Sequence, residues 1–190
     1  MSMSAEPEWV ALAWRLPGSG SSTPRVTTWR SLQRLGAARL TPGAALLPYR
    51  EELVEQLEWL AQEIEQQGGD AWVLPVTALS DREAKLVREQ MATDRDDEYR
   101  ALEADALAFH DRMLDRPTRP DTFAARQQID KELVALQRRY RKIRARDYVD
   151  ASGRTNAARA IDRCLTYRQG VSAKLLPVTD PELSQVEVDA

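Results

Sequence analysis

The sequence contains a single cysteine, Cys164, and a single histidine, His110, among its 190 residues. One cysteine excludes a disulfide within the chain and excludes zinc sites that are built from four cysteines. It also favours a reducing compartment, so we expect a cytoplasmic protein. A Ser/His/Asp triad would have to recruit His110, whose neighbour Phe109 lies on an apolar helix stripe. We therefore expect His110 to border a helix interface.

Long hydrophobic runs and a strong net charge are also missing. No window approaches the length of a membrane span, and the first eight residues lack the basic and apolar regions of a signal peptide. We therefore expect no membrane contact. The net charge of −3 argues against a protein that coats nucleic acid with its whole surface. A local basic patch is still compatible with this balance.

The motifs of the common enzyme classes are not found. The sequence has no phosphate loop of the Walker type, no Rossmann glycine pattern and no Cys/His spacing that would hold a metal. We therefore expect a protein that is not an enzyme and that uses neither a cofactor nor a metal ion.

The first half of the chain alternates between strand and helix patterns. Short apolar runs are separated by Gly36, by the hairpin residues Pro42 and Gly43, and by Gly68 and Gly69. The expected elements are a strand at 9–16, a helix at 26–35, strands at 37–40 and 44–47, a helix at 48–67 and a strand at 70–77. The order βαββαβ predicts a ferredoxin-like domain, in which two helices cover a four-stranded antiparallel sheet.

The second half shows only helix periodicity. One long helix is expected from residue 80 to near Pro117, a second begins after a cap at Asp121, and a third covers residues 155–173. Cys164 falls on the expected inner side of the third helix, so we expect it to be buried. The fold class is thus α+β, with a ferredoxin-like domain at 8–79, a helical extension of a hairpin plus a third helix at 80–176, and disordered tails at 1–7 and 177–190.

Positive charge gathers in two places. Between Arg15 and Arg39 every charged residue is an arginine, and the stretch includes a glycine-rich loop at 17–24. A second run lies at the end of the second long helix. The candidate anion or nucleic-acid contacts are Arg15, Arg25, Arg30, Arg34, Arg138, Arg139, Arg141, Lys142, Arg144 and Arg146.

The second run also has a purely structural interpretation. Cations near the end of a helix complement the helix dipole, and Glu132 or Asp147 could pair with some of them. Both interpretations of the run stay open at the level of the sequence.

Several stretches resemble the amino-terminal domain of ChrB, the chromate-resistance regulatory protein. The most specific are PRVTTWRSLQRLGA, which begins at Pro24, and RRYRKIRARDYV, which begins at Arg138. The resemblance runs from about Trp9 to about Ala173. It implies a chromate-responsive regulator of a chromate efflux operon that acts at promoter DNA. The carboxy-terminal domain of longer relatives has no counterpart here, so its role is not carried over.

More distantly, the first half is similar to the sheet domain of phenylacetic-acid-type repressors and to ferredoxin-like CRISPR-associated endoribonucleases. Such nucleases have a metal-binding aspartate where this chain has Arg15, and a cation cannot ligate a metal. We therefore expect a regulator whose arginines bind DNA phosphates or an oxyanion such as chromate. The alternative is a protein–protein interaction or homodimerisation module that binds no nucleic acid.

Overall fold

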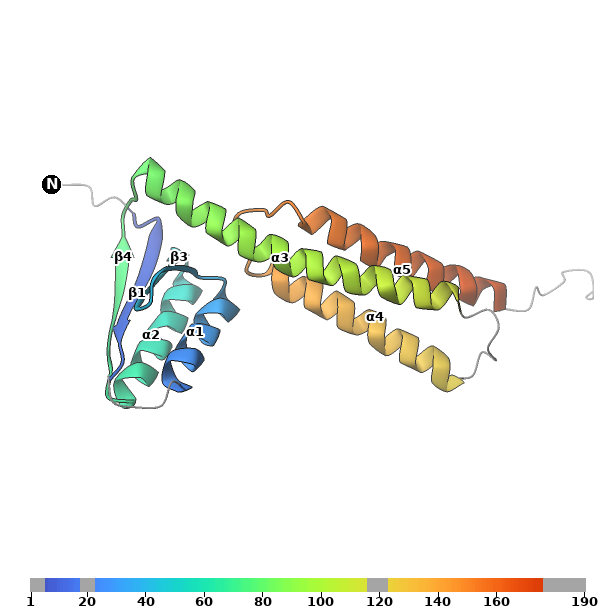
Figure 1. Ribbon diagram of the computed structural model, residues 1–190, viewed down its shortest axis with the longest axis horizontal. Coiled ribbons are helices and arrows are strands. Elements are labelled where there is room, and N and C mark those ends of the chain that lie inside the picture. Colours follow the sequence, from blue (N-terminus) through green and yellow to red (C-terminus); the bar gives the residue numbers. More distant parts are fainter. Residues whose placement is uncertain (1–5, 18–22, 116–122, 176–190) are drawn as a thin grey trace, which may run out of the picture.

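The computed structural model describes residues 6–17, 23–115 and 123–175 (Figure 1). The disorder predicted for residues 1–5 and 177–190, most of the loop at 17–24, and the turn and helix cap predicted at 117–121 lie outside these residues. Residues 6 and 7 have no regular secondary structure. The elements are β1 (Trp9–Arg15), α1 (Thr23–Leu35), β2 (Ala38–Thr41), β3 (Ala44–Pro48), α2 (Glu51–Gln66), β4 (Asp70–Val76), α3 (Asp81–Leu114), α4 (Phe123–Arg144) and α5 (Arg154–Leu175).

The strands form one antiparallel sheet in the order β2-β3-β1-β4. The first strand is central and pairs with β3 on one side and with β4 on the other. This order, with a helix after β1 and another after β3, is the ferredoxin-like arrangement. The predicted α+β fold class is confirmed.

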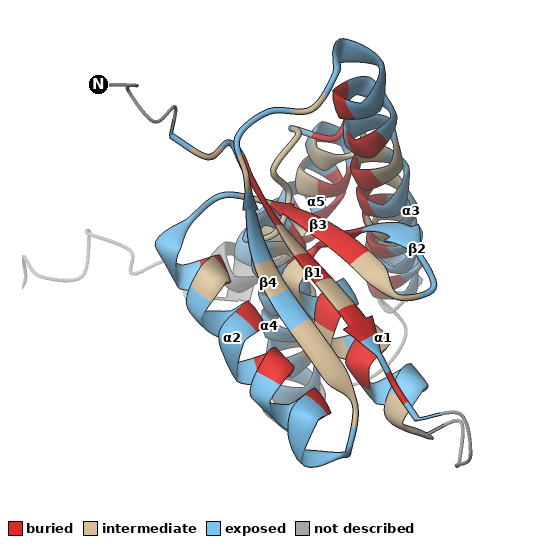
Figure 2. Ribbon diagram, turned by 90° about the vertical axis from the view of Figure 1, so that its left-hand side faces the viewer, coloured by how far each residue is buried: buried red, intermediate tan, exposed pale blue. Residues whose placement is uncertain are grey.

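One face of the sheet is covered by α1 and α2 (Figure 2). Val10, Leu12 and Trp14 alternate along β1 and are buried against this helix pair. The apolar stripe of α2 meets them with Leu57 and Ile64, both almost completely buried. Full burial of one such side chain contributes about 1.5–3 kcal/mol to stability. A shift of the strand by one residue would expose all of these side chains, so their alternation fixes which face of the sheet meets the helices.

The opposite face of the sheet is covered only in part. Trp9 and Leu46 pack against Val87 and Met91 near the start of α3. Toward the edge strand, Trp72 of β4 stays 53% exposed. Trp59 of α2 is likewise 62% exposed. Helical and strand periodicity identify an apolar position, but they do not say whether another element covers it.

The third helix connects the two halves of the molecule. It begins with a capping box, in which the Ser80 hydroxyl accepts from the Glu83 amide at 3.3 Å and the Glu83 carboxylate accepts from the Ser80 amide at 3.2 Å. The helix then continues for 34 residues, away from the sheet and into the helical layer (Figure 1). One rigid element thus belongs to both hydrophobic cores.

The helices α3, α4 and α5 form the predicted three-helix layer around a second core. Tyr99, Leu102 and Phe109 of α3 meet Leu133 of α4 and Ile161 of α5. The expected interface position of His110 agrees with the structure, since its ring packs edge-on against that of Tyr167 with the ring centres 5.8 Å apart. None of the described helices has both the length and the apolar composition that a membrane span requires.

Cys164 is fully buried in this core, as the sequence predicts. Its thiol lies 3.3 Å from the carbonyl oxygen of Ala106, and burial raises the pKa of the thiol. Because the thiolate is the reactive form, we expect a thiol reagent to label native protein slowly and denatured protein at once. Stopped-flow labelling checks this, and rapid labelling of the native protein would show that the thiol is accessible.

Candidate anion-binding site

Four arginines from three elements line one open pocket beside the sheet. Arg15 comes from the end of β1, Arg25 and Arg30 come from α1, and Arg39 comes from β2. The pocket has a volume of about 620 Å³ and includes Trp14, Trp29 and the hairpin residues Pro42 and Gly43. No described acidic residue lines it. The fold therefore brings together cations that are up to 24 positions apart in sequence, from 15 to 39. We call this the arginine pocket.

Arg15 differs from the free cation that the sequence predicted. Its guanidinium donates to the Asp70 carboxylate from Nε at 3.0 Å and from Nη2 at 2.6 Å. The two residues are direct cross-strand neighbours because β1 and β4 pair in antiparallel register. Both side chains are well exposed, so the pair contributes little to stability, but it neutralises part of the positive charge at this end of the pocket.

Arg39 completes the pocket and was not among the predicted contacts. Its guanidinium carbon lies 5.1 Å from the centre of the Trp29 ring, in the range of a cation–π contact. The sequence feature that could have identified Arg39 is its position at the end of the arginine-only stretch. Only the tertiary structure places this residue of β2 beside Trp29 of α1.

Arg25 and Arg30 remain the free cations of the pocket. Both are exposed, and neither forms a hydrogen bond or ion pair with another described residue. A guanidinium presents several N–H donors in a fixed plane and stays charged at neutral pH. An anion that enters the arginine pocket would therefore meet unused charged donors.

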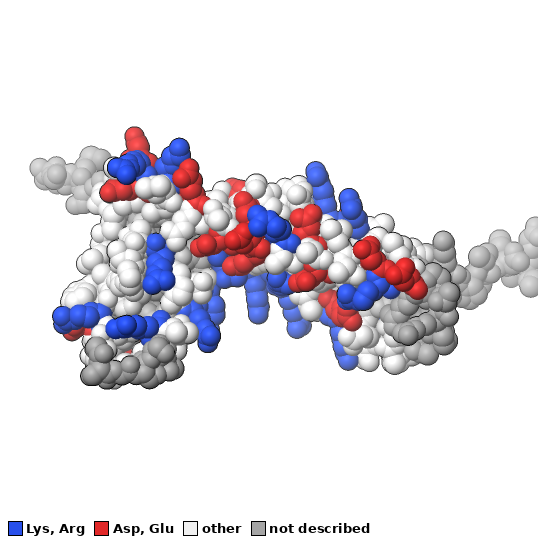
Figure 3. Space-filling view, in the orientation of Figure 1, with Lys and Arg blue, Asp and Glu red and all other residues white. Residues whose placement is uncertain are grey.

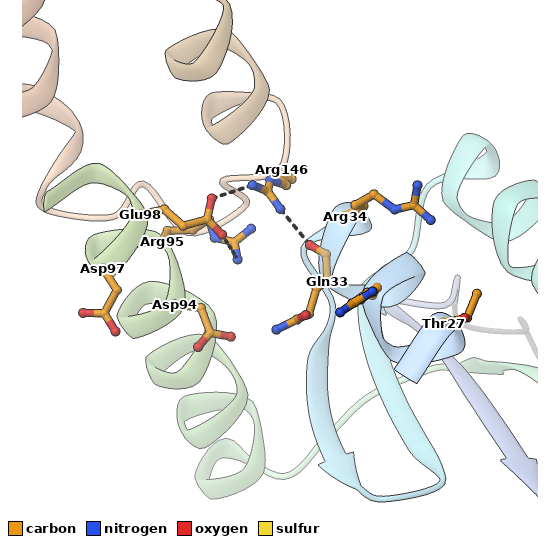
Figure 4. A pocket seen from close by; sticks show the side chains of 9 residues that line it. Thr27, Gln33, Arg34, Asp94, Arg95, Asp97, Glu98 and Arg146 are labelled. Atoms are coloured by element: carbon orange, nitrogen blue, oxygen red, sulfur yellow. Dashed lines mark hydrogen bonds and ion pairs between the residues drawn. The ribbon is translucent and has the colours of Figure 1, made fainter. Parts of the chain in front are cut away.

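Arg34 lies on the other side of α1, in an open groove of about 680 Å³ between α1 and α3 (Figure 4). Its Nη2 donates to the Ser31 hydroxyl at 2.8 Å. Arg30 lines both the groove and the arginine pocket. Arg30 and Arg34 therefore line this groove together, and Arg30 also lies at the arginine pocket, so the two sites are neighbours.

Arg146, which the sequence predicted as an anion or nucleic-acid contact, is largely buried and is engaged within the protein. Its side chain is 21% exposed; Nη2 contacts Glu98 of α3 at 2.5 Å, and Nη1 donates to the carbonyl of Gln33 in α1 at 2.8 Å (Figure 4). Burial lowers the pKa of this guanidinium. Arg146 therefore ties the sheet half to the helical half of the molecule.

Two stretches that are far apart in the sequence meet at this contact between the sheet half and the helical half, which we call the joint. A Cβ added to Gly36, which follows α1, would lie 2.7 Å from the carbonyl oxygen of Arg146, so the two backbones pass close to each other. The Tyr148 hydroxyl donates to the Leu35 carbonyl at 2.8 Å. The Asp147 carboxylate accepts from the Tyr99 hydroxyl at 3.1 Å. The two stretches with the most specific family resemblance therefore form one contact between the halves.

The rest of the basic run lies on α4. Arg139 pairs with Asp105 of α3, which the sequence did not predict. The partners that were considered for the run are engaged elsewhere, Glu132 with Arg112 and Asp147 with Tyr99. The cations of the run that stay exposed without an ion pair to any described residue are Arg138, Arg141, Lys142 and Arg144.

Figure 3 shows how these charges are distributed over the helical layer. Lysines and arginines project from the lower edge, where α4 lies, and from the upper edge, where α5 lies. Acidic side chains lie between them over α3. Among the described residues, no group of histidine, cysteine, aspartate or glutamate side chains is arranged to hold a metal ion.

Comparison with known proteins gives a consistent assignment. Residues 25–179 match the family model described as Protein ChrB, N-terminal. The chain is also similar to Protein ChrB of Cupriavidus metallidurans, with 38% identity over 96 residues, which covers 50% of this chain and 29% of that protein. No solved structure matches the chain. Because the family model covers most of the chain, from α1 through α5, the chain belongs to the family of ChrB amino-terminal domains.

Proposed function

We propose that this protein is a chromate-responsive regulator, which binds an oxyanion in the arginine pocket and DNA phosphates along α4. Membership of the ChrB family links the chain with chromate resistance. The protein acts by binding and not as an enzyme. The observation that carries the proposal is the convergence of Arg15, Arg25, Arg30 and Arg39 on one pocket without an acidic residue in its lining.

The chemistry of the pocket suits a small tetrahedral dianion such as chromate. Charge-assisted hydrogen bonds from guanidinium groups are short and directional, and each contributes about 1.5–3 kcal/mol. Arg25 and Arg30, which have no hydrogen bond or ion pair with a described residue, can provide them. Trp29 supports Arg39 from one side and keeps its guanidinium at the pocket. Arg15 contributes less, since Asp70 already accepts from it.

The exposed face of α4 suits the DNA backbone. Arg138, Arg141, Lys142 and Arg144 lie within two helical turns and have no acidic partner among the described residues. Contacts of this kind position a protein on DNA and supply affinity without reading sequence. DNA binding through α4 should therefore weaken steeply as salt is added.

A second candidate function is a protein–protein interaction or homodimerisation module. The specific observation is the apolar patch on the edge strand, where Trp72 is 53% and Leu74 is 47% exposed. Apolar side chains side by side on an uncovered sheet face are typical of docking surfaces. Binding that is driven by this patch would depend little on salt, which separates the two candidates.

We expect the double variant Arg25→Gln/Arg39→Gln to bind chromate on the order of 100-fold more weakly, since two charged hydrogen bonds are removed. Arg34→Gln is the matched control, because Arg34 is equally exposed on α1 but lines the groove and not the pocket. Isothermal titration calorimetry gives the affinities, and melting curves check the fold. Equal chromate affinity in the double variant and the unmodified protein would exclude the arginine pocket as the oxyanion site.

A further inference from the structure

The joint between the two halves contains more positive charge than its one carboxylate can balance. Glu98 contacts Arg95 at 2.9 Å and Arg146 at 2.5 Å. The side chains of these arginines are only 6% and 21% exposed. Two largely buried guanidinium groups therefore share a single negative charge, and water screens the excess poorly at this depth.

Arg95 also has hydrogen-bonding capacity that the protein does not use. Its Nη2 contacts Glu98, but Nε and Nη1 are buried and have no acceptor among the described residues. A buried donor without a partner costs about 1–3 kcal/mol, and more when it carries charge. Such a side chain is rare in a structural joint unless an acceptor is supplied from elsewhere.

Arg95 and Arg146 both line the groove between α1 and α3, which has a volume of about 680 Å³ (Figure 4). Arg30 and Arg34 add two further guanidinium groups from the side of α1. The groove is thus lined by four cations, and it is open to a molecule larger than a simple ion.

Acidic residues on the same groove do not cancel this charge. Asp97 is held by Arg100 at 2.6 Å. Asp94 has no ion pair with a described residue; burial raises its pKa, and the positive charge of Arg95 opposes this rise. Glu98 is the only carboxylate that contacts the buried arginines among the described residues, and its side chain is 31% exposed at the edge of the groove. It can therefore turn toward water when another anion takes its place.

We propose that this groove binds a phosphate group, free or on a small organic molecule, in place of the Glu98 carboxylate. A phosphate dianion brings two charges to Arg95 and Arg146 where Glu98 brings one, and its oxygens can reach donors that a single carboxylate cannot. Arg146 keeps its bond to the Gln33 carbonyl, so the joint stays closed. The site is separate from the oxyanion site proposed above and shares only Arg30 with it among the arginines.

The test uses the full chain with Arg25→Gln/Arg39→Gln, in which the arginine pocket is disabled and the groove is intact. Inorganic phosphate and adenosine monophosphate are the two probes, titrated by calorimetry at constant ionic strength. We expect binding of phosphate, and we expect the added change Glu98→Gln to tighten it by at least about tenfold, because a neutral amide no longer competes for both guanidiniums. Glu89→Gln, on the same helix and paired with Lys85 but outside the groove, is the control and should leave the affinity unchanged.

The outcomes separate this site from the chromate site. Loss of chromate binding with retention of phosphate binding in the double variant supports two independent sites. Equal affinity for the two probes assigns recognition to the phosphate group alone, whereas tighter binding of the nucleotide assigns an organic phosphate. Failure of both probes to bind, or a Glu98→Gln affinity equal to that of the control, overturns the proposal. Should Glu98→Gln not fold, the melting temperature of the Arg25→Gln/Arg39→Gln chain decides, since phosphate bound in the groove must raise it above the value in sodium chloride of equal ionic strength.

Discussion

Replacing Gly36 by alanine is expected to destabilise the protein by about 3 kcal/mol or more, far beyond a typical surface substitution. Gly36 has a φ of 83°, a conformation in which a side chain costs roughly 1–2 kcal/mol. A Cβ at this position would also lie 2.7 Å from the carbonyl oxygen of Arg146. That backbone cannot easily move aside, because the Arg146 side chain is fixed to Glu98 and to Gln33.

Gly68 provides a matched control for this prediction. Its φ of 79° is nearly the same, but the nearest atom to an added Cβ is Pro17 Cγ at 4.0 Å. Gly68→Ala therefore carries the backbone strain without the steric conflict, and we expect it to lose only about 1–2 kcal/mol. Chemical denaturation of both variants gives the difference. Equal losses of stability in the two variants would show that the backbone at the joint between α1 and the segment after α4 moves to accommodate the added Cβ.

Reversing two charges on α4 is expected to have the largest effect on DNA binding. In Arg138→Glu/Lys142→Glu two exposed cations one helical turn apart become anions. We expect the affinity for duplex DNA at low salt to fall on the order of 100-fold. The slope of log affinity against log salt should become shallower by about two, because each phosphate that a cation no longer neutralises reduces it by roughly 0.9. Fluorescence anisotropy over a salt series measures both quantities.

The control for this change lies on the opposite edge of the helical layer. Arg159 and Arg163 of α5 have the same spacing, are exposed and form no ion pair with another described residue. Arg159→Glu/Arg163→Glu changes the net charge by the same amount. An effect of net charge alone would therefore lower the affinity for DNA equally in both variants. A specific role of α4 predicts a much smaller loss in the α5 variant. Salt-independent binding that neither variant alters would instead favour the apolar patch at Trp72 and a protein partner.

The order of the secondary structure and the composition of the two cores were set by local patterns in the sequence. Alternation along β1 and the three- and four-residue spacing of apolar positions in α2 and α3 specify which faces are buried, because strand and helix geometry repeat over a few residues. The burial of Cys164 follows from the same periodicity. The arginine-only stretch from 15 to 39 likewise indicated a positive surface without knowledge of the fold.

Only the tertiary structure decided which of the ten predicted cations are available. Arg15, Arg139 and Arg146 found acidic partners 55, 34 and 48 residues away in sequence. Such pairs depend on strand register and on how α3 crosses the other elements, and no local pattern encodes either. The same packing brought Arg39 into the arginine pocket and buried Arg95 at the joint. Charge in a sequence therefore predicts a surface, whereas long-range packing determines whether that charge binds a ligand or the protein itself.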